Sequence, residues 1–201
     1  MQQDASELLS DARKRRFLFL QILTLGRIPL AFVFAAVLLG SERTPLVLLV
    51  SGMILGLADL TDFFDGILAR RLGIATEWGA MVDPYADSIA RITAYWALAC
   101  AGLVIPLVPL AMALRDVSVA YCRIMLAKHG VSVSARRSGK IKALVQAIGA
   151  VFAVLGPIYH PITGTWPIYV VSWVVIVVTL GSLVEYAKAA ISVAAKGLGQ
   201  R

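Results

Sequence analysis

Five aspartates lie within a strongly apolar stretch of the chain: Asp59, Asp62, Asp65, Asp83 and Asp87. Asp62 and Asp65 are three positions apart, so both lie on one face if their segment is helical. The four-residue spacing of Asp83 and Asp87 has the same consequence. An ionised carboxylate in a membrane helix is costly unless it is compensated, so these residues are candidates for function.

The spacing of the last four aspartates predicts a metal site. Carboxylates packed together repel one another, and the nearby cations Arg70, Arg71 and Arg91 are too few and too spread along the helices to neutralise them. Carboxylate ligands without Cys or His favour Mg²⁺ or Mn²⁺ over zinc. Two such ions commonly clamp the attacking and leaving oxygens of a phosphoryl displacement. We therefore expect two divalent ions at Asp62, Asp65, Asp83 and Asp87.

Two other interpretations of the aspartates stay open. A single intramembrane aspartate, such as Asp59, often serves helix packing or a proton relay. A carboxylate-lined cation transporter would also cluster aspartates, but it is expected to have broken helices and a site at mid-membrane. Here the cluster is predicted near one membrane surface, which favours an enzyme.

The composition indicates the fold class. Of the 201 residues, 59% are hydrophobic and 15% charged, with a mean hydropathy of +0.81, which is too apolar for a soluble domain of this size. We expect an all-α integral membrane protein with an N-terminal interfacial amphipathic helix over residues 1–16 and a six-helix transmembrane domain over residues 17–201. The transmembrane helices are predicted at residues 17–39, 45–70, 77–103, 106–128, 139–158 and 166–190.

The basic residues predict the topology. The net charge is +7, but Lys and Arg gather in short runs between apolar segments, which argues against nucleic-acid binding. Nearly all of these runs fall on one side of the predicted membrane, and only Arg43 lies on the other. Both termini and the aspartate cluster are therefore expected to face the cytoplasm. Cys100 and Cys122 lie in apolar stretches and are expected to be buried.

The aspartates belong to a longer pattern that resembles a known signature. It reads Asp62-x-x-Asp65-Gly66-x-x-Ala69-Arg70, then eight residues, then Gly79-x-x-x-Asp83-x-x-x-Asp87. This string is similar at every position to the signature of the CDP-alcohol phosphotransferases. The resemblance implies six transmembrane helices in a bacterial cytoplasmic membrane, usually a homodimer, and a cytoplasmic cavity where CDP-diacylglycerol meets an alcohol.

The resemblance also implies residue roles. Asp62, Asp65 and Asp83 would bind the metals, while Asp87 would bind metal and act as general base toward the acceptor hydroxyl. The resulting alkoxide would attack the β-phosphorus, and CMP would leave. The residues expected near the CDP group are Gly66, Ala69, Arg70, Thr76 and Gly79, with Thr24 as a weaker candidate.

Basic residues in the second half of the chain suggest the acceptor. Arg115 and Arg123 are eight apart, hence on one helix face, and Lys140 opens the next helix. Together they can cradle a dianionic phosphate, and the surrounding residues resemble the family branch that acts on glycerol 3-phosphate. Arg115 could instead form an internal ion pair with Asp116, and Lys140 could be a topology signal.

The chain departs from that branch at three positions. It has Ser88 where a lysine is usual, Asp116 where a glutamate is usual, and Ala143 where a threonine is usual. An inositol-phosphate acceptor would use similar basic residues, whereas free serine would not need them. The acceptor therefore stays open, as do the roles of Arg27 and Glu185, either of which could line the cavity or pair within the bundle.

Overall fold

The computed structural model describes residues 2–72, 77–129 and 137–198. This part of the chain contains helices and no strand, so the all-α prediction is confirmed. The helices are α1 (Gln2–Gly40), α2 (Pro45–Leu72), α3 (Glu77–Cys100), α4 (Leu107–Lys128), α5 (Arg137–Val154), α6 (Gly156–Thr163) and α7 (Trp166–Leu198).

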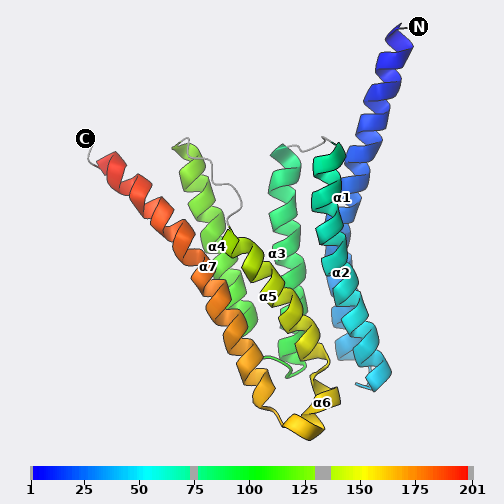
Figure 1. The fold of residues 1–201 in the computed structure, drawn as a ribbon, viewed down its shortest axis with the longest axis vertical. Helices are drawn as coiled ribbons and strands as arrows, with labels where there is room; N and C mark the ends of the chain where they lie inside the picture. The colour runs from blue at the N-terminus through cyan, green and yellow to red at the C-terminus, as the bar shows by residue number, and fades with distance from the viewer. Residues whose placement is uncertain (1, 73–76, 130–136, 199–201) are drawn as a thin grey trace.

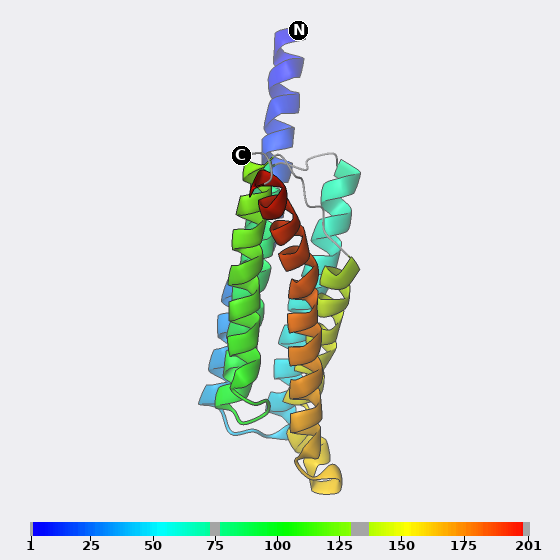
Figure 2. The same cartoon turned by 90° about the vertical axis from the view of Figure 1, so that its left-hand side faces the viewer.

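The long helices run side by side in an elongated bundle (Figures 1 and 2). Helix α1 packs against α2 and α3, α4 packs against α3 and α7, and α5 packs against α2, α3 and α7. Figure 1 shows both ends of the chain at the same end of the bundle, where α2 finishes and α3 begins, and α6 at the opposite end. The short connection between α1 and α2, residues 41–44, lies at the α6 end.

Three predicted helix boundaries are wrong. Helix α1 continues without a break through residues 16 and 17, where a separate N-terminal helix was expected to end. The helix predicted over residues 139–158 stops at Val154, and α6 turns away from α5 by 71°. Pro157 at the start of α6 lacks the amide hydrogen that would continue the hydrogen-bonding pattern of α5. Helix α7 extends to Leu198, beyond the predicted residue 190.

The helices support a membrane protein with fewer clear spans than predicted. Judged by length and apolar composition, two described segments can cross a membrane, Gln21–Gly40 and Trp166–Val193. A third is possible if the bent pair formed by Ile141–Val154 and Gly156–Thr163 is one span, and Pro45–Thr61 is a shorter apolar helix. Charged side chains interrupt the apolar sequence of α3 and α4, so composition alone does not establish six spans.

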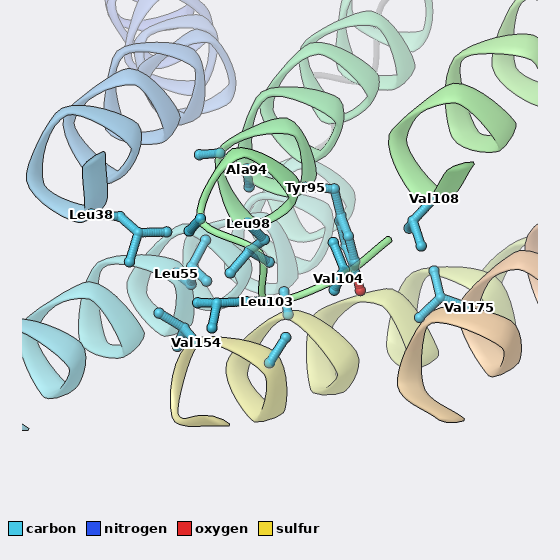
Figure 3. Close-up of a cluster of buried hydrophobic side chains, with 14 of the residues drawn as sticks. Leu38, Leu55, Ala94, Tyr95, Leu98, Leu103, Val104, Val108, Val154 and Val175 are labelled. Carbon is cyan, nitrogen blue, oxygen red and sulfur yellow. The ribbon is translucent and has the colours of Figure 1, made fainter. Parts of the chain in front are cut away.

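A buried apolar cluster joins six helices, α1 to α5 and α7, toward the α6 end of the bundle (Figure 3). It includes Leu38 of α1, Leu55 of α2, Leu98 of α3, Val154 of α5 and Val175 of α7. Burial of such side chains is the main favourable term in holding helices together in water, and close packing takes that role within lipid.

The connection between α3 and α4 folds into this cluster. Gly102 adopts a φ of +71°, which a residue without Cβ accepts easily, and the turn places Leu103 and Val104 in the core. The amide of Ile105 donates a hydrogen bond to Oγ of Ser172 on α7 at 3.0 Å. This contact fixes the α3–α4 connection against α7.

The outer surface of the bundle is apolar, as expected where helices face lipid. Ile22, Leu46 and Val177 have exposed fractions of 70%, 70% and 65%. The prediction that both cysteines are buried is wrong, because Cys100 is exposed and Cys122 is partly exposed. A small apolar side chain on a lipid-facing surface needs no protein cover.

Candidate active site

The five aspartates lie on two helices, α2 and α3. Asp59, Asp62 and Asp65 belong to the second half of α2, and Asp83 and Asp87 belong to the first half of α3. Figure 1 shows these two helix segments at the end of the bundle where the chain termini lie. The side chains of Asp62 and Asp65 lie outside the described part of the structure.

One buried arginine joins the two aspartates of α3. Nη2 of Arg27, on α1, donates a hydrogen bond to Oδ1 of Asp83 at 3.2 Å, and its Nη1 lies 3.9 Å from Oδ1 of Asp87. The Arg27 side chain is 3% exposed, whereas those of Asp83 and Asp87 are 53% and 24% exposed. The two carboxylates therefore lie on one helix face, as their spacing predicted.

A second arginine fixes Asp87 against α2 and α5. Nε of Arg91 donates to Oδ1 of Asp87 at 2.6 Å, and Nη2 lies 3.2 Å from Oδ1 of Asp59 on α2. Nη1 donates to the backbone oxygen of Ala143 on α5 at 3.2 Å. Charge-assisted hydrogen bonds of this kind hold a carboxylate more firmly than neutral ones. Asp59 thus takes part in the site as an ion-pair partner of Arg91.

A cavity lies beside these charged groups, between α1, α2, α3 and α5. Arg27, Asp59, Asp87 and Arg91 line its polar part, and the alanines of α2, α3 and α5 line much of the rest. Gln146, which is 1% exposed, also faces it. The cavity therefore combines a charged wall with an apolar one, as a site for an amphipathic substrate requires.

Carboxylates are the ligands that a hard divalent cation prefers, and Asp83 and Asp87 supply two of them on one face of α3. Among the side chains that the structure describes, no three His, Cys, Asp or Glu residues form a metal-binding group. That set includes only two of the four predicted ligands, Asp83 and Asp87. The contacts that described residues make with Asp87 all reach Oδ1, so they leave the second carboxylate oxygen for another partner.

Two of the predicted CDP-binding residues lie near Arg27 and Asp83. Thr24 is buried on α1, one turn before Arg27, and Gly79 lies on α3, one turn before Asp83. Gly66, Ala69 and Arg70 belong to α2, but their side chains are not among those described, and Thr76 lies outside the described residues altogether.

A second polar cluster centres on Asp116 of α4. Oδ2 of Asp116 accepts a hydrogen bond from Oγ of Ser88 on α3 at 2.8 Å. Its Oδ1 accepts hydrogen bonds from Nη1 of Arg115 at 2.8 Å and from Nζ of Lys142 on α5 at 3.3 Å. The internal ion pair between Arg115 and Asp116 is therefore present, and it also includes Lys142.

Helix α7 completes this cluster. Nε of Arg115 donates to Oγ of Ser182 at 2.9 Å, and Nη2 of Arg123 donates to the hydroxyl of Tyr186 at 3.3 Å. Both guanidinium groups lie over the Tyr186 ring, with Cζ 5.7 Å from its centre for Arg115 and 5.4 Å for Arg123. The predicted common face of Arg115 and Arg123 is confirmed, because one ring contacts both.

Several members of the two clusters were not predicted as site residues: Arg27, Asp59 and Arg91 in the first, and Ser88, Asp116 and Lys142 in the second. The Lys140 side chain, which was predicted to join Arg115 and Arg123, lies outside the described set. Lys142 takes part instead, and it is a lysine that is 6% exposed. A charged residue inside an apolar helix was the available sequence signal for Lys142, as it was for Arg27.

Comparison with known proteins identifies the family. The family model described as CDP-alcohol phosphatidyltransferase matches residues 19–192. The chain belongs to the CDP-alcohol phosphatidyltransferase family. It is therefore a transferase of phospholipid biosynthesis, with a CDP-activated donor and an alcohol acceptor. The cation-transporter alternative is set aside, and the general use of a divalent metal in this family agrees with the carboxylates of α2 and α3.

Several bacterial members of this phosphatidyltransferase family are similar to the chain. A probable phosphatidylglycerophosphate synthase of Mycobacterium tuberculosis is 36% identical over 142 residues, which cover 69% of this chain and 68% of that protein. The CDP-diacylglycerol–glycerol-3-phosphate 3-phosphatidyltransferase of Bacillus subtilis is 33% identical over 66% of this chain and 74% of its own length. A protein of that same description from Rickettsia bellii is 29% identical over 83% of this chain and 92% of its own length.

Proposed function

We propose that this chain transfers the phosphatidyl group of CDP-diacylglycerol to a hydroxyl of glycerol 3-phosphate, giving phosphatidylglycerophosphate and CMP. The observation that carries the proposal is the position of Asp87, whose carboxylate lines the cavity and is held by Arg91 at 2.6 Å beside Asp83. The names of the bacterial relatives support the choice of acceptor.

Asp87 acts as the general base in this proposal. Its carboxylate accepts the proton of the acceptor hydroxyl, whose oxygen forms a bond to the β-phosphorus as the bond from that phosphorus to the CMP oxygen breaks. Arg91 and Arg27 orient the carboxylate through Oδ1. Two Mg²⁺ or Mn²⁺ ions held by Asp62, Asp65, Asp83 and Asp87 would neutralise the diphosphate charge when bound.

The substrates are assigned to the two polar clusters. The CDP group lies near the α2–α3 end, against Gly66, Ala69, Arg70, Thr76, Gly79 and Thr24. Arg115, Arg123, Lys140 and, from its position in the second cluster, Lys142 bind the acceptor phosphate. Nε of Arg123 is buried and has no partner among the described residues, so it is a donor available to an anion.

The membrane arrangement in this proposal keeps six transmembrane helices, with the site and both termini on the cytoplasmic side of a bacterial inner membrane. The placement of the chain ends beside the α2–α3 end supports this orientation (Figure 1), as does the excess of Lys and Arg there. The exposed Trp166, Tyr169 and Trp173 of α7 lie toward the opposite surface, where aromatic residues anchor membrane helices. A homodimer is the proposed assembly.

The test is CMP release by the purified protein with CDP-diacylglycerol and Mg²⁺. The acceptors compared are glycerol 3-phosphate, inositol 1-phosphate, inositol and serine, each also assayed with excess EDTA. We expect turnover with glycerol 3-phosphate and its loss in EDTA. Turnover with another acceptor alone would contradict the proposed acceptor, and turnover that survives EDTA would contradict the two-metal site.

A further inference from the structure

Asp116 connects three helices through one carboxylate. Ser88 of α3 donates a hydrogen bond to Oδ2, whereas Arg115 of α4 and Lys142 of α5 both donate to Oδ1. The Asp116 side chain is 10% exposed, and those of Arg115 and Lys142 are 8% and 7% exposed. Through Arg115, the same carboxylate is linked to Ser182 of α7.

The charges of this cluster require Asp116. Arg115 and Lys142 bring two positive charges to the same carboxylate oxygen, and both side chains are almost entirely removed from water. Two cations that share one carboxylate oxygen repel each other strongly where the surroundings are poorly polarisable. A carboxylate between them allows both cations to stay buried and ordered. Asp116 itself carries a negative charge, so it is unsuited to contact a phosphate.

The cluster also lies next to the proposed general base. Ser88 directly follows Asp87 on α3, so the hydrogen bond from Ser88 ties Asp116 to the segment that carries the base. Through Asp116, the ammonium group of Lys142 is connected to the same segment of α3. A substrate group bound at Lys142 would therefore lie close to the segment that carries Asp87.

We propose that Asp116 is a positioning residue for the acceptor. It holds Lys142 and Arg115 in fixed places relative to Asp87, so that a phosphorylated alcohol bound by these cations presents its hydroxyl to the base. Asp116 acts through the two cations and does not contact the substrate. This inference rests on the proposed function, because it requires a phosphorylated acceptor.

The first test is the Asp116→Asn variant, which keeps the shape of the side chain and removes its charge. We expect the KM for glycerol 3-phosphate to rise about 10-fold or more, the effect of removing one partner of a buried charge pair. The KM for CDP-diacylglycerol should stay near that of the wild type. The inhibition constant of inorganic phosphate, measured against glycerol 3-phosphate, should rise in parallel, and Asp116→Glu should recover most of the affinity.

A double-mutant cycle separates positioning from general stability. If Asp116 acts through Lys142, then Asp116→Asn should add little to the acceptor KM of Lys142→Met, because the group it positions is already gone. Additive effects, or equal rises in the KM of both substrates, would overturn the inference. So would a lower KM for glycerol 3-phosphate in Asp116→Asn, because Asp116 would then be a competitor of the phosphate.

A milder variant covers the case in which Asp116→Asn does not fold. Ser88→Ala removes only the hydrogen bond to Oδ2 and should raise the acceptor KM about 3-fold, as expected for one hydrogen bond. Ser118→Ala is its control, because the Ser118 hydroxyl bonds only to the Leu114 carbonyl among the described groups. An unchanged KM in Ser88→Ala would contradict the link to α3.

Wild-type protein that fails to use glycerol 3-phosphate contradicts the proposed function itself, whereas an active wild type with unaffected variants contradicts this inference alone.

Discussion

Arg27 donates a hydrogen bond to Asp83 at 3.2 Å, although 56 positions separate the two residues along the chain. The contact joins α1 to α3 and brings a buried positive charge to the carboxylates of the proposed metal site. Arg27 therefore compensates part of the negative charge of the cluster, while Asp83 stays half exposed and accessible to a cation.

Replacing Arg27 should make folding depend more strongly on metal. The Arg27→Met variant leaves the negative charges of Asp83 and Asp87 with less compensation. Because Asp83 is half exposed, we expect the free energy of unfolding to fall by about 1–3 kcal/mol in metal-free buffer. Mg²⁺ should restore part of that loss by supplying the missing positive charge. Thermal unfolding in detergent, with EDTA or with Mg²⁺, measures both effects. Arg43→Met, in the exposed α1–α2 connection, is the control; an equal loss with and without Mg²⁺ would contradict the interpretation.

Replacing Asp87 should abolish turnover while the protein still folds. Asp87→Asn keeps the size of the side chain and removes the proton acceptor, so CMP release should fall by about 100-fold to 10,000-fold. Initial rates at saturating substrate concentrations measure the change. Glu42→Gln, at an exposed position of the α1–α2 connection, should keep full activity. Substantial turnover by a well-folded Asp87→Asn protein would remove Asp87 from the mechanism.

Replacing Arg91 should lower kcat because it loosens Asp87. A lysine keeps the charge but cannot reach the carboxylates of Asp87 and Asp59 and the carbonyl of Ala143 together. We expect Arg91→Lys to lower kcat about 10-fold, the loss associated with one hydrogen bond to a charged group. A kcat equal to that of the wild type would show that charge alone is sufficient at this position.

Helix packing beneath the site should be sensitive to a single methyl group. A Cβ at Gly149 of α5 would lie 2.9 Å from the Tyr95 hydroxyl and 2.9 Å from Cγ2 of Val175. The Tyr95 hydroxyl also donates to the Gln146 carbonyl at 2.7 Å, so it cannot move freely. Gly149→Ala should therefore destabilise the protein by about 1–3 kcal/mol.

Gly181→Ala on α7 is the matched control for Gly149→Ala. A Cβ there meets no described atom within 4 Å, and alanine favours a helix over glycine by about 1 kcal/mol. It should be neutral or stabilising in the same thermal unfolding measurement. Equal stability of the two variants would contradict the close packing of α3, α5 and α7 at Gly149.

The sequence by itself determined the features that depend on neighbouring positions. The helical pitch places Asp83 and Asp87 on one face and Arg115 and Arg123 on another, and no tertiary information is needed for either. The signature over residues 62–87 was sufficient to recognise the family that the family model then identified. The break between α5 and α6 was also encoded locally, in Gly156 and Pro157, although the prediction continued one helix through it.

Only the tertiary structure decided which distant residues meet. The role of Arg27 was left open because nothing in the sequence of α1 specifies that the buried face of this helix packs on α3 beside Asp83. The pairing of Asp116 with both Ser88 and Lys142 likewise depends on α3, α4 and α5 being neighbours. Local spacing fixes the face on which a side chain lies, but the neighbour of that face is set by how all the helices pack together. That packing converts separate charged positions into the two clusters of the proposed site.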